Sequence, residues 1–327
     1  MDSLPPLPLR FEPVYKDYLW GGDRIPRTFH RPLPPGRHAE AWELADRPEG
    51  LSRVSTGPLA GASLHELTVR FGAQLLGRRV APRPHFPLLI KLIDARERLS
   101  VQVHPDEEAA ARLGGEPKTE AWYVLAADGG ACVYAGLLSG VTPADFEAAA
   151  RAGRLETCLQ QVPVATGDTL FVPAGRVHAI GGGCLLLEVQ QNSNTTYRAY
   201  DWNRLDANGR PRELHLRQAL QAIHWHDTGP VKCRAQLLVS GPPATVRLLV
   251  SCRHFALERL ELTAEAPWDN PGDSFHVLFP LDPVRLETAA GGEPLAAGMT
   301  CLLPACLARY RLMPAARRAC VLRISVP

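Results

Sequence analysis

Three features that would decide a protein class at once are missing from this sequence of 327 residues: a long hydrophobic run, closely paired cysteines and a strong net charge. No uninterrupted apolar segment reaches the roughly 20 residues that a membrane-spanning helix needs. The N-terminus has prolines where a signal peptide needs a continuous apolar core. We therefore expect a cytoplasmic protein that does not associate with membranes.

The eight cysteines include no pair separated by two residues, and most lie in apolar segments. This usage favours buried free thiols in a reducing compartment over a disulfide framework. The 36 basic and 34 acidic residues leave a formal net charge of +2, which provides no general attraction to nucleic acid. A hydrophobic content of 46% is ordinary for a folded globular protein.

Proline and glycine, in contrast, are abundant: 30 prolines and 27 glycines divide the chain into short segments. Such punctuation is typical of a mainly β protein. The turn residues Asp128-Gly129-Gly130 between apolar runs 122–127 and 131–136 predict a hairpin. Apolar periodicity and N-cap signals predict a few short helices, over residues 63–76, 107–113, 143–152, 154–161 and 216–223.

A short repeat suggests two related halves. Gly167 and Gly298 each begin a segment with Thr two residues later and Pro-Ala six residues later. We interpret the halves as duplicated β units, with a catalytic domain over 1–230 and a degenerate β domain over 231–327. His178 lies eleven residues after the first glycine, and Arg309 stands at that position in the second copy. Only the first half is therefore expected to bind metal.

Four side chains form a candidate metal site. Gln102 and His104 are two residues apart in an alternating run, so on a strand they point to the same face. Glu120 begins a second apolar run, and His178 follows a Pro-Ala-Gly turn. One histidine alone is more often a surface or core residue than a ligand, but the four donors together predict a site. The donor types suit Zn²⁺, Mn²⁺, Fe²⁺ or Co²⁺, and the absence of a nearby cysteine argues against a closed structural zinc site.

The same motifs carry a family resemblance. The segment from Gly167 to His178 resembles the second cupin motif, and His104 with Glu120 resembles the first. Together with LIKLIDARERLSVQVHPDEEAA, PKTEAWYVL and EVQQNSNTTYRAYDWNR, they resemble type I mannose-6-phosphate isomerases, particularly the short bacterial form. The resemblance implies double cupin-like jelly-roll β-barrels with a few short helices. It also implies a metal-dependent enzyme that interconverts mannose 6-phosphate and fructose 6-phosphate through a cis-enediol.

The resemblance implies roles for individual residues. One Zn²⁺ per chain, or another divalent metal, would be bound by Gln102, His104, Glu120 and His178. Arg198 and Lys118 would be catalytic, and Ser100, Trp20 and Glu40 would contact the substrate. A permanently protonated guanidinium suits Arg198 to stabilising the enediolate. Lys118 could transfer a proton or hold the sugar, and the sequence leaves both roles open.

The expected partner is a small sugar phosphate, held at its phosphate by Ser100 with basic residues such as Arg198 and Arg204. We expect a monomer or a weak homodimer. Two other functions fit a cupin: a sugar-phosphate-binding module without turnover, and an iron-dependent oxygenase. All four ligands, Lys118 and Arg198 are present, which favours an active enzyme over a module that has lost turnover. An oxygenase would leave Lys118 and Arg198 without a role.

Overall fold

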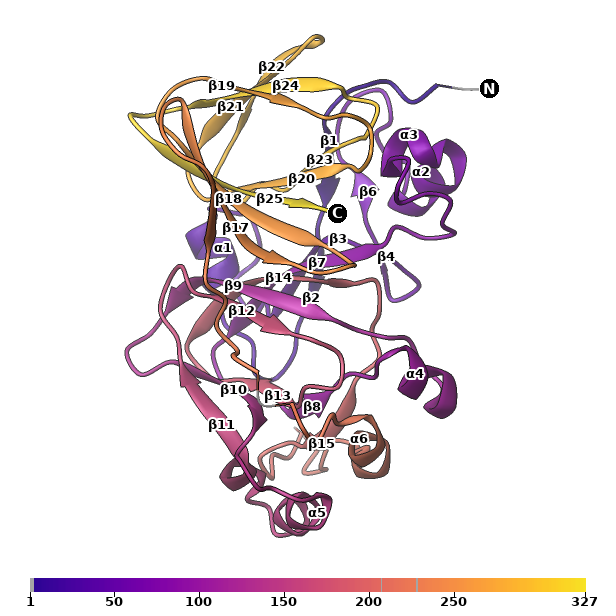
Figure 1. Ribbon diagram of the computed structural model, residues 1–327, viewed down its shortest axis with the longest axis vertical. Helices are drawn as coiled ribbons and strands as arrows, with labels where there is room; N and C mark the ends of the chain where they lie inside the picture. Colours follow the sequence, from indigo (N-terminus) through magenta and orange to yellow (C-terminus); the bar gives the residue numbers. More distant parts are fainter. Residues whose placement is uncertain (1–2, 207, 228) are drawn as a thin grey trace. The chain divides into compact units, whose positions relative to one another are not determined.

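The computed structural model describes residues 3–206, 208–227 and 229–327, and the chain is mainly β, as predicted (Figure 1). It forms two compact units: unit 1 comprises Met1–Val14, Trp42–Leu89 and Arg234–Pro327, and unit 2 comprises Tyr15–Ala41 and Ile90–Cys233. The junction at 233/234 lies beside the predicted boundary at 230, while two N-terminal segments group with the C-terminal part. The division into a catalytic and a degenerate domain stays a prediction.

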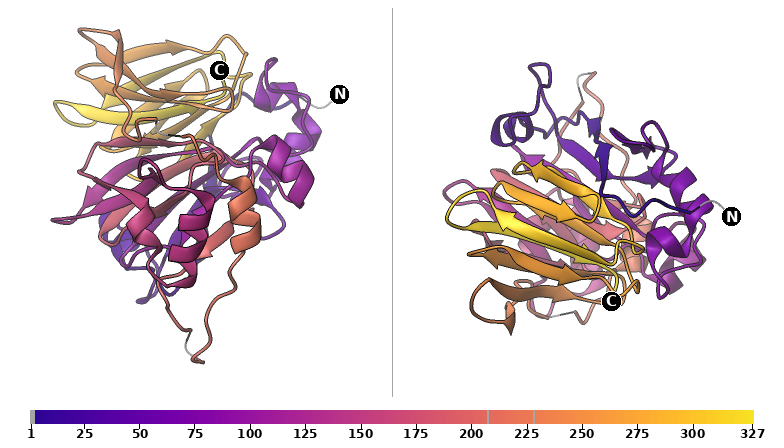
Figure 2. Two further views of the ribbon diagram at one scale, coloured as in Figure 1. Left: turned by 60° about the horizontal axis from the view of Figure 1, so that its bottom comes forward. Right: turned by 90° about the horizontal axis from the view of Figure 1, so that it is seen from above.

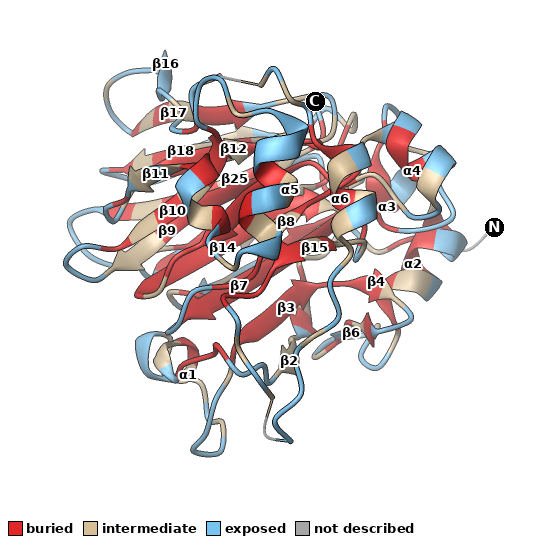
Figure 3. Ribbon diagram, turned by 90° about the horizontal axis from the view of Figure 1, so that it is seen from below, coloured by how far each residue is buried: buried red, intermediate tan, exposed pale blue. Residues whose placement is uncertain are grey.

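Two sheets dominate the region that includes unit 2. The six-stranded sheet has the order β12 (Thr169–Val172), β9 (Glu120–Ala127), β14 (Cys184–Gln191), β7 (Leu88–Ala95), β3 (Glu40–Leu44) and β2 (Val14–Lys16). The five-stranded sheet has the order β11 (Leu159–Pro163), β10 (Cys132–Leu137), β13 (His178–Ile180), β8 (Val101–Val103) and β15 (Tyr197–Tyr200). Strands β3, β7 and β14 are buried along almost their whole length (Figure 3).

The hairpin predicted around Asp128-Gly129-Gly130 is wrong. Strand β9 pairs with β12 and β14, whereas β10 pairs with β11 and β13. The turn therefore carries the chain from one sheet to the other. The first five residues of β9 are all buried. The backbone hydrogen bonds of this strand are made by a neighbour on each side within its own sheet. A local turn signal does not reveal that long-range pairing.

The helices are short, as predicted. Among the described residues they are α1 (Arg24–Thr28), α2 (Leu64–Phe71), α3 (Ala73–Leu76), α4 (Glu107–Leu113), α5 (Pro143–Arg151) and α6 (Leu216–Ala222). Ser63 and Thr142 each form a capping box that starts α2 and α5. Helices α5 and α6 pack their buried residues on strands of the five-stranded sheet (Figure 2). No helix in the described ranges combines the length and apolarity required to cross a bilayer.

The helix predicted over 154–161 is correct only for its first half. A 3₁₀ helix covers Leu155–Cys158, and the chain then continues as β11. The residues of β11 alternate between more buried and more exposed, which is the period of a strand. Its pairing with β10 overrides the weak helical signal of the sequence.

Unit 1 contains an eight-stranded sheet, a four-stranded sheet and a two-stranded pair. The eight-stranded order is β16 (Gln236–Val239), β17 (Ala244–Ser251), β18 (Ala256–Leu262), β25 (Ala319–Ser325), β20 (His276–Pro280), β23 (Cys301–Leu303), β1 (Leu9–Glu12) and β6 (Arg53–Val54). The other strands are β19 (Ala266–Asp269), β24 (Arg309–Pro314), β21 (Val284–Thr288) and β22 (Gly291–Leu295), with β4 (Asp46–Arg47) paired to β5 (Gly50–Leu51).

The sequence repeat corresponds to a repeated piece of structure. Gly167 and Gly298 both adopt a positive φ, +91° and +75°, and each precedes a short strand, β12 or β23. A glycine suits this backbone because it has no Cβ. His178 is the first residue of β13 and Arg309 is the first residue of β24. Arg309 is exposed and pairs with Asp269 at 2.9 Å.

Candidate metal centre and substrate pocket

Three neighbouring strands of the five-stranded sheet carry candidate residues side by side. Gln102 of β8 lies directly opposite His178 of β13 and, on its other side, opposite Arg198 of β15. Directly opposed residues of paired strands point to the same face of a sheet. The two predicted ligands and the predicted catalytic arginine therefore share one face.

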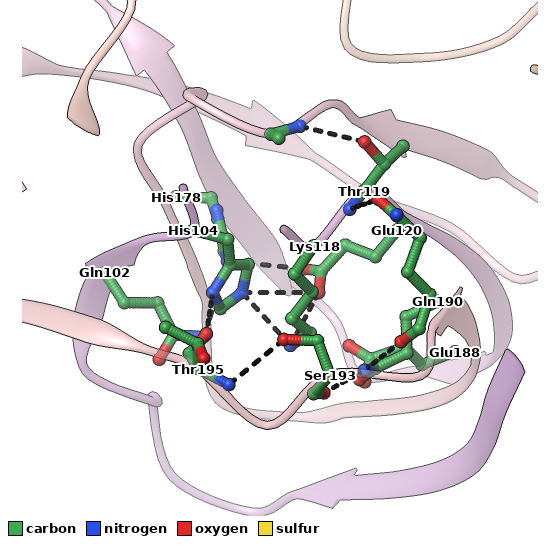
Figure 4. Close-up of polar contacts among 12 residues, drawn as sticks. Gln102, His104, Lys118, Thr119, Glu120, His178, Glu188, Gln190, Ser193 and Thr195 are labelled. Carbon is green, nitrogen blue, oxygen red and sulfur yellow. Dashed lines mark hydrogen bonds and ion pairs between the residues drawn. The ribbon is translucent and has the colours of Figure 1, made fainter. Parts of the chain in front are cut away.

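Glu120 approaches the same place from the six-stranded sheet. It is the first residue of β9, and its carboxylate oxygens lie 3.3 Å from Nε2 of His104 and 3.3 Å from Nε2 of His178. The side-chain amide nitrogen of Gln102 is also 3.3 Å from Nε2 of His178, and the same amide can present its oxygen by rotation. The structure thus brings all four predicted ligands together (Figure 4).

Both imidazoles are oriented with Nε2 toward the centre. Nδ1 of His104 lies 2.9 Å from the carbonyl oxygen of Thr195, and Nδ1 of His178 lies 2.9 Å from the carbonyl oxygen of Arg176. A ring that donates from Nδ1 keeps Nε2 available as a ligand. Burial, together with the Lys118 ammonium, lowers the pKa of His104 to about 3, and burial lowers the pKa of His178. The rings are therefore neutral at neutral pH.

The donor set fits a divalent metal ion. Zinc ligands at about 2.0–2.1 Å in a tetrahedral arrangement lie roughly 3.3 Å from one another, and three pairs of these donors are 3.3 Å apart. Both carboxylate oxygens of Glu120 are buried and accept no hydrogen bond of ordinary geometry from the described residues, although Lys118 Nζ lies 2.9 Å from one of them. Burial acts to raise the pKa of Glu120, but the Lys118 ammonium opposes this effect, and that pKa lies well below its ordinary value. An ionised carboxylate is thus aimed at the centre.

A cavity of about 330 Å³ in unit 2 borders this centre through Gln102 and Lys118. Its lining includes the remaining predicted site residues, Trp20, Glu40, Ser100 and Arg198. The Arg198 guanidinium is held by two hydrogen bonds: Nε donates to Ser100 Oγ at 3.3 Å and Nη1 donates to the carbonyl oxygen of Glu213 at 2.8 Å. Trp20 is buried and stacks on Tyr18. Both rings line the cavity and form one of its walls.

Arg204, which the sequence suggested as a phosphate contact, is engaged elsewhere. Its guanidinium pairs with Asp201 at 2.5 Å and donates to the carbonyl oxygen of Arg98 at 2.6 Å, and it does not line the cavity. Arg212 lines the cavity instead, and it lies near enough to Arg198 to contribute to lowering the pKa of that residue, after burial. Arg212 belongs to a loop without periodicity, so no pattern in the sequence pointed to it.

A buried ion pair beside the cavity was also missed by sequence reasoning. Lys91 Nζ lies 3.3 Å from Glu188 and 3.8 Å from Glu40, and Trp122 Nε1 donates to Glu188 at 3.0 Å. Burial acts against the charge on Lys91, but Glu40 and Glu188 outweigh it and raise the lysine pKa. A signal was available, because a charged residue inside each of the apolar strands LLIKLIDA and CLLLEVQQ requires a buried partner.

Replacing Lys91 by methionine is expected to reduce the free energy of unfolding by about 3–5 kcal/mol, because the Glu188 carboxylate would be left buried without its cation. Urea unfolding followed by circular dichroism measures this change. The matched control is Lys232→Met, which breaks a partly exposed pair with Asp168 and should cost less than about 1 kcal/mol. Equal losses in the two variants would contradict the role given to the buried pair.

A mainly β fold with a buried two-histidine, one-carboxylate centre beside a polar cavity defines a metal-binding protein of the cupin type. Residues 9–132 match the family model of the type I phosphomannose isomerase catalytic domain. The chain is 42% identical over 218 residues to mannose-6-phosphate isomerase ManA of Bacillus subtilis, covering 66% of this chain and 68% of that protein. It is 39% identical over 217 residues to the mannose-6-phosphate isomerase of Streptococcus mutans, covering 66% and 67%.

The fold agrees with a solved structure over nearly the whole chain. The crystal structure of the mannose 6-phosphate isomerase from Bacillus subtilis matches with a TM-score of 0.88 and 30% sequence identity, covering 97% of this chain and 99% of that chain. This chain therefore belongs to the type I phosphomannose isomerase family. The family resemblance and the mainly β fold class predicted from the sequence are confirmed.

Proposed function

We propose that this protein interconverts mannose 6-phosphate and fructose 6-phosphate, and that zinc is its metal. The observation that carries the proposal is that the four metal-type donors come together beside one cavity, which Gln102, Lys118 and Arg198 line. Its similarity to mannose-6-phosphate isomerases favours the isomerase over a binding module or an oxygenase. A cytoplasmic location and a monomer or weak homodimer are further proposals, which rest on the sequence.

The reaction moves a proton between C1 and C2 of the sugar, and negative charge develops on the two neighbouring oxygens. Gln102, His104, Glu120 and His178 would hold the metal ion, which when bound supplies a Lewis acid for those oxygens. Arg198 adds a fixed positive charge on the same face of the sheet as Gln102 and His178. Its two protein hydrogen bonds fix the guanidinium before substrate arrives, which reduces the cost of reorganisation.

Lys118 holds the position closest to the ligands. Its ammonium lies 2.9 Å from Glu120 and 3.1 Å from Nε2 of His104, and its side chain lines the cavity. From there it can donate to a sugar hydroxyl or carry the proton between C1 and C2. Glu40 and Trp20 form the remainder of the proposed sugar contact, as a hydrogen-bond acceptor and as an apolar wall.

The phosphate end is assigned to Ser100 and Arg212, beside Arg198. Arg212 and Ser100 both line the cavity, and a guanidinium together with a hydroxyl provides hydrogen-bond donors for a dianion. Arg212→Ala is expected to raise KM for the sugar phosphate by about tenfold to hundredfold with a smaller change in kcat, because a uniform binding contact is lost. Steady-state kinetics measures both parameters.

The control for this substitution is Arg204→Ala. Both arginines contact Asp201, at 2.5 Å and 3.5 Å, but only Arg212 lines the cavity. Arg204→Ala should leave KM within about twofold of the wild type, since no substrate contact is removed. A KM for Arg212→Ala as low as that of Arg204→Ala would contradict the phosphate assignment.

A coupled assay with purified, zinc-loaded protein tests the function directly. We expect the protein to convert fructose 6-phosphate to mannose 6-phosphate and the reverse, and to do so in the absence of oxygen. Glucose 6-phosphate and other aldose phosphates serve as competing substrates. Tight binding of fructose 6-phosphate without turnover would favour the binding module and reject the enzyme.

A further inference from the structure

A second cluster of metal-type donors lies in unit 1. Asp46 is the first residue of β4, His65 is in helix α2, and His85 precedes β7. Nδ1 of His65 lies 3.1 Å from Oδ1 of Asp46, and Nδ1 of His85 lies 3.4 Å from the same oxygen. The three donor atoms lie within 4.8 Å of one another. None of these residues belongs to the cavity or the centre in unit 2.

The three donors are held in place by separate parts of the backbone. The Asp46 side chain is buried, and its second oxygen, Oδ2, accepts a hydrogen bond from the backbone N–H of Phe86 at 2.8 Å. Phe86 is fully buried and packs on the ring of Phe275, which fixes the position of the preceding His85. His65 lies in the first turn of α2, between Ser63 and Glu66, the two residues of the capping box. Hydrogen bonds and packing of the protein itself therefore hold the three donors, as a preorganised site requires.

The arrangement has the properties of an open site. Ligands at about 2.0–2.1 Å from a tetrahedral metal lie roughly 3.3 Å apart, close to the separations of 3.1 Å and 3.4 Å in this cluster. The side chains of His65 and His85 are 41% and 54% exposed, so a coordination position faces solvent. Two imidazoles with one carboxylate select zinc and similar transition metals over calcium and magnesium, which prefer oxygen donors.

We propose that Asp46, His65 and His85 form a second divalent-metal site, which binds zinc or a similar transition-metal ion. The bound ion would link helix α2 and the segment before β7 to strand β4 through three protein ligands. The site is independent of the proposed isomerase function, because it uses none of the residues of the cavity. Its expected effect is local: the linked segments open less often when the ion is bound.

Metal counting tests the proposal. Protein stripped with a chelator is dialysed against Zn²⁺ buffered in the micromolar range, and bound zinc is measured by mass spectrometry. We expect about two zinc ions per wild-type chain and about one in His65→Gln and in His85→Gln, since an open site with two ligands binds much more weakly. Glutamine retains an N–H that can donate to Asp46, so these variants keep the apo contacts. His226→Gln, which replaces an exposed histidine of unit 2, is the matched control and should bind as the wild type does.

Hydrogen exchange locates the second ion. In Glu120→Gln, where the centre of unit 2 is disabled, zinc should slow amide exchange in residues 64–86 severalfold. Adding His85→Gln to that variant should remove the effect. Zinc contents that are equal in the wild type and in both cluster variants, or exchange in 64–86 that does not respond to zinc, would overturn the proposal.

Discussion

Glu120→Gln should abolish metal binding in unit 2 and lower kcat/KM for mannose 6-phosphate by about 10³-fold or more. The substitution preserves size but removes the charge that lies 3.3 Å from both histidines. It also leaves the Lys118 ammonium, 2.9 Å from the carboxylate, without its counter-charge beside the metal position. Two cations would then face each other in a buried site. We expect zinc affinity at this centre to fall by more than about a hundredfold.

Two comparisons separate metal loss from general damage. Chelation of the wild type should remove activity, and added zinc should restore it, whereas Glu120→Gln should stay inactive at the same zinc concentration. Glu188→Gln is the structural control, because Glu188 is a buried carboxylate beside the same cavity but outside the ligand group. It should retain zinc at the centre. A Glu120→Gln enzyme with wild-type kcat would reject the assignment of the ligands.

The predictable part of the site was the part encoded locally. Gln102 and His104 are recognised by their spacing in an alternating run, although β8 ends at Val103 and His104 is the next residue. Glu120 and His178 each open a strand, as their positions after turn residues indicated. That the four side chains meet at one point depends on strand pairing, which only the resemblance to the family implied. The same holds for the capped helices α2 and α5. In each of them the two residues that form the capping box are only three positions apart in the sequence.

The unpredicted part depends on pairings between distant segments. The turn at 128–130 was visible in the sequence, but its use as a link between sheets depends on the partners of β9 and β10. Lys91 and Glu188 each showed a buried charge without showing its partner. The cluster of Asp46, His65 and His85 has no regular spacing, because its three members lie on three elements joined only by tertiary packing. Residue type and period carry no information about such contacts.

Arg198→Ala should lower kcat by about 10²–10³-fold with zinc content unchanged, because the charge that it stabilises is present only in the transition state. Burial lowers the pKa of the Arg198 guanidinium, but an arginine remains protonated throughout the neutral range. The pH profile of the wild type should therefore show no step from this group. The effect should fall mainly on kcat, in contrast to the KM effect expected for Arg212→Ala.

Arg198→Lys distinguishes positive charge from fixed geometry. Arg198 uses Nε toward Ser100 and Nη1 toward the Glu213 carbonyl, so a planar group with several donors is oriented by two contacts at once. Lysine retains the charge but concentrates its donors at one atom, and it cannot reproduce both contacts in that geometry. We expect Arg198→Lys to recover less than about a tenth of the lost kcat. Full recovery would show that charge alone suffices, and an Arg198→Ala variant that changes KM but not kcat would place this arginine at the phosphate rather than at the reacting carbons.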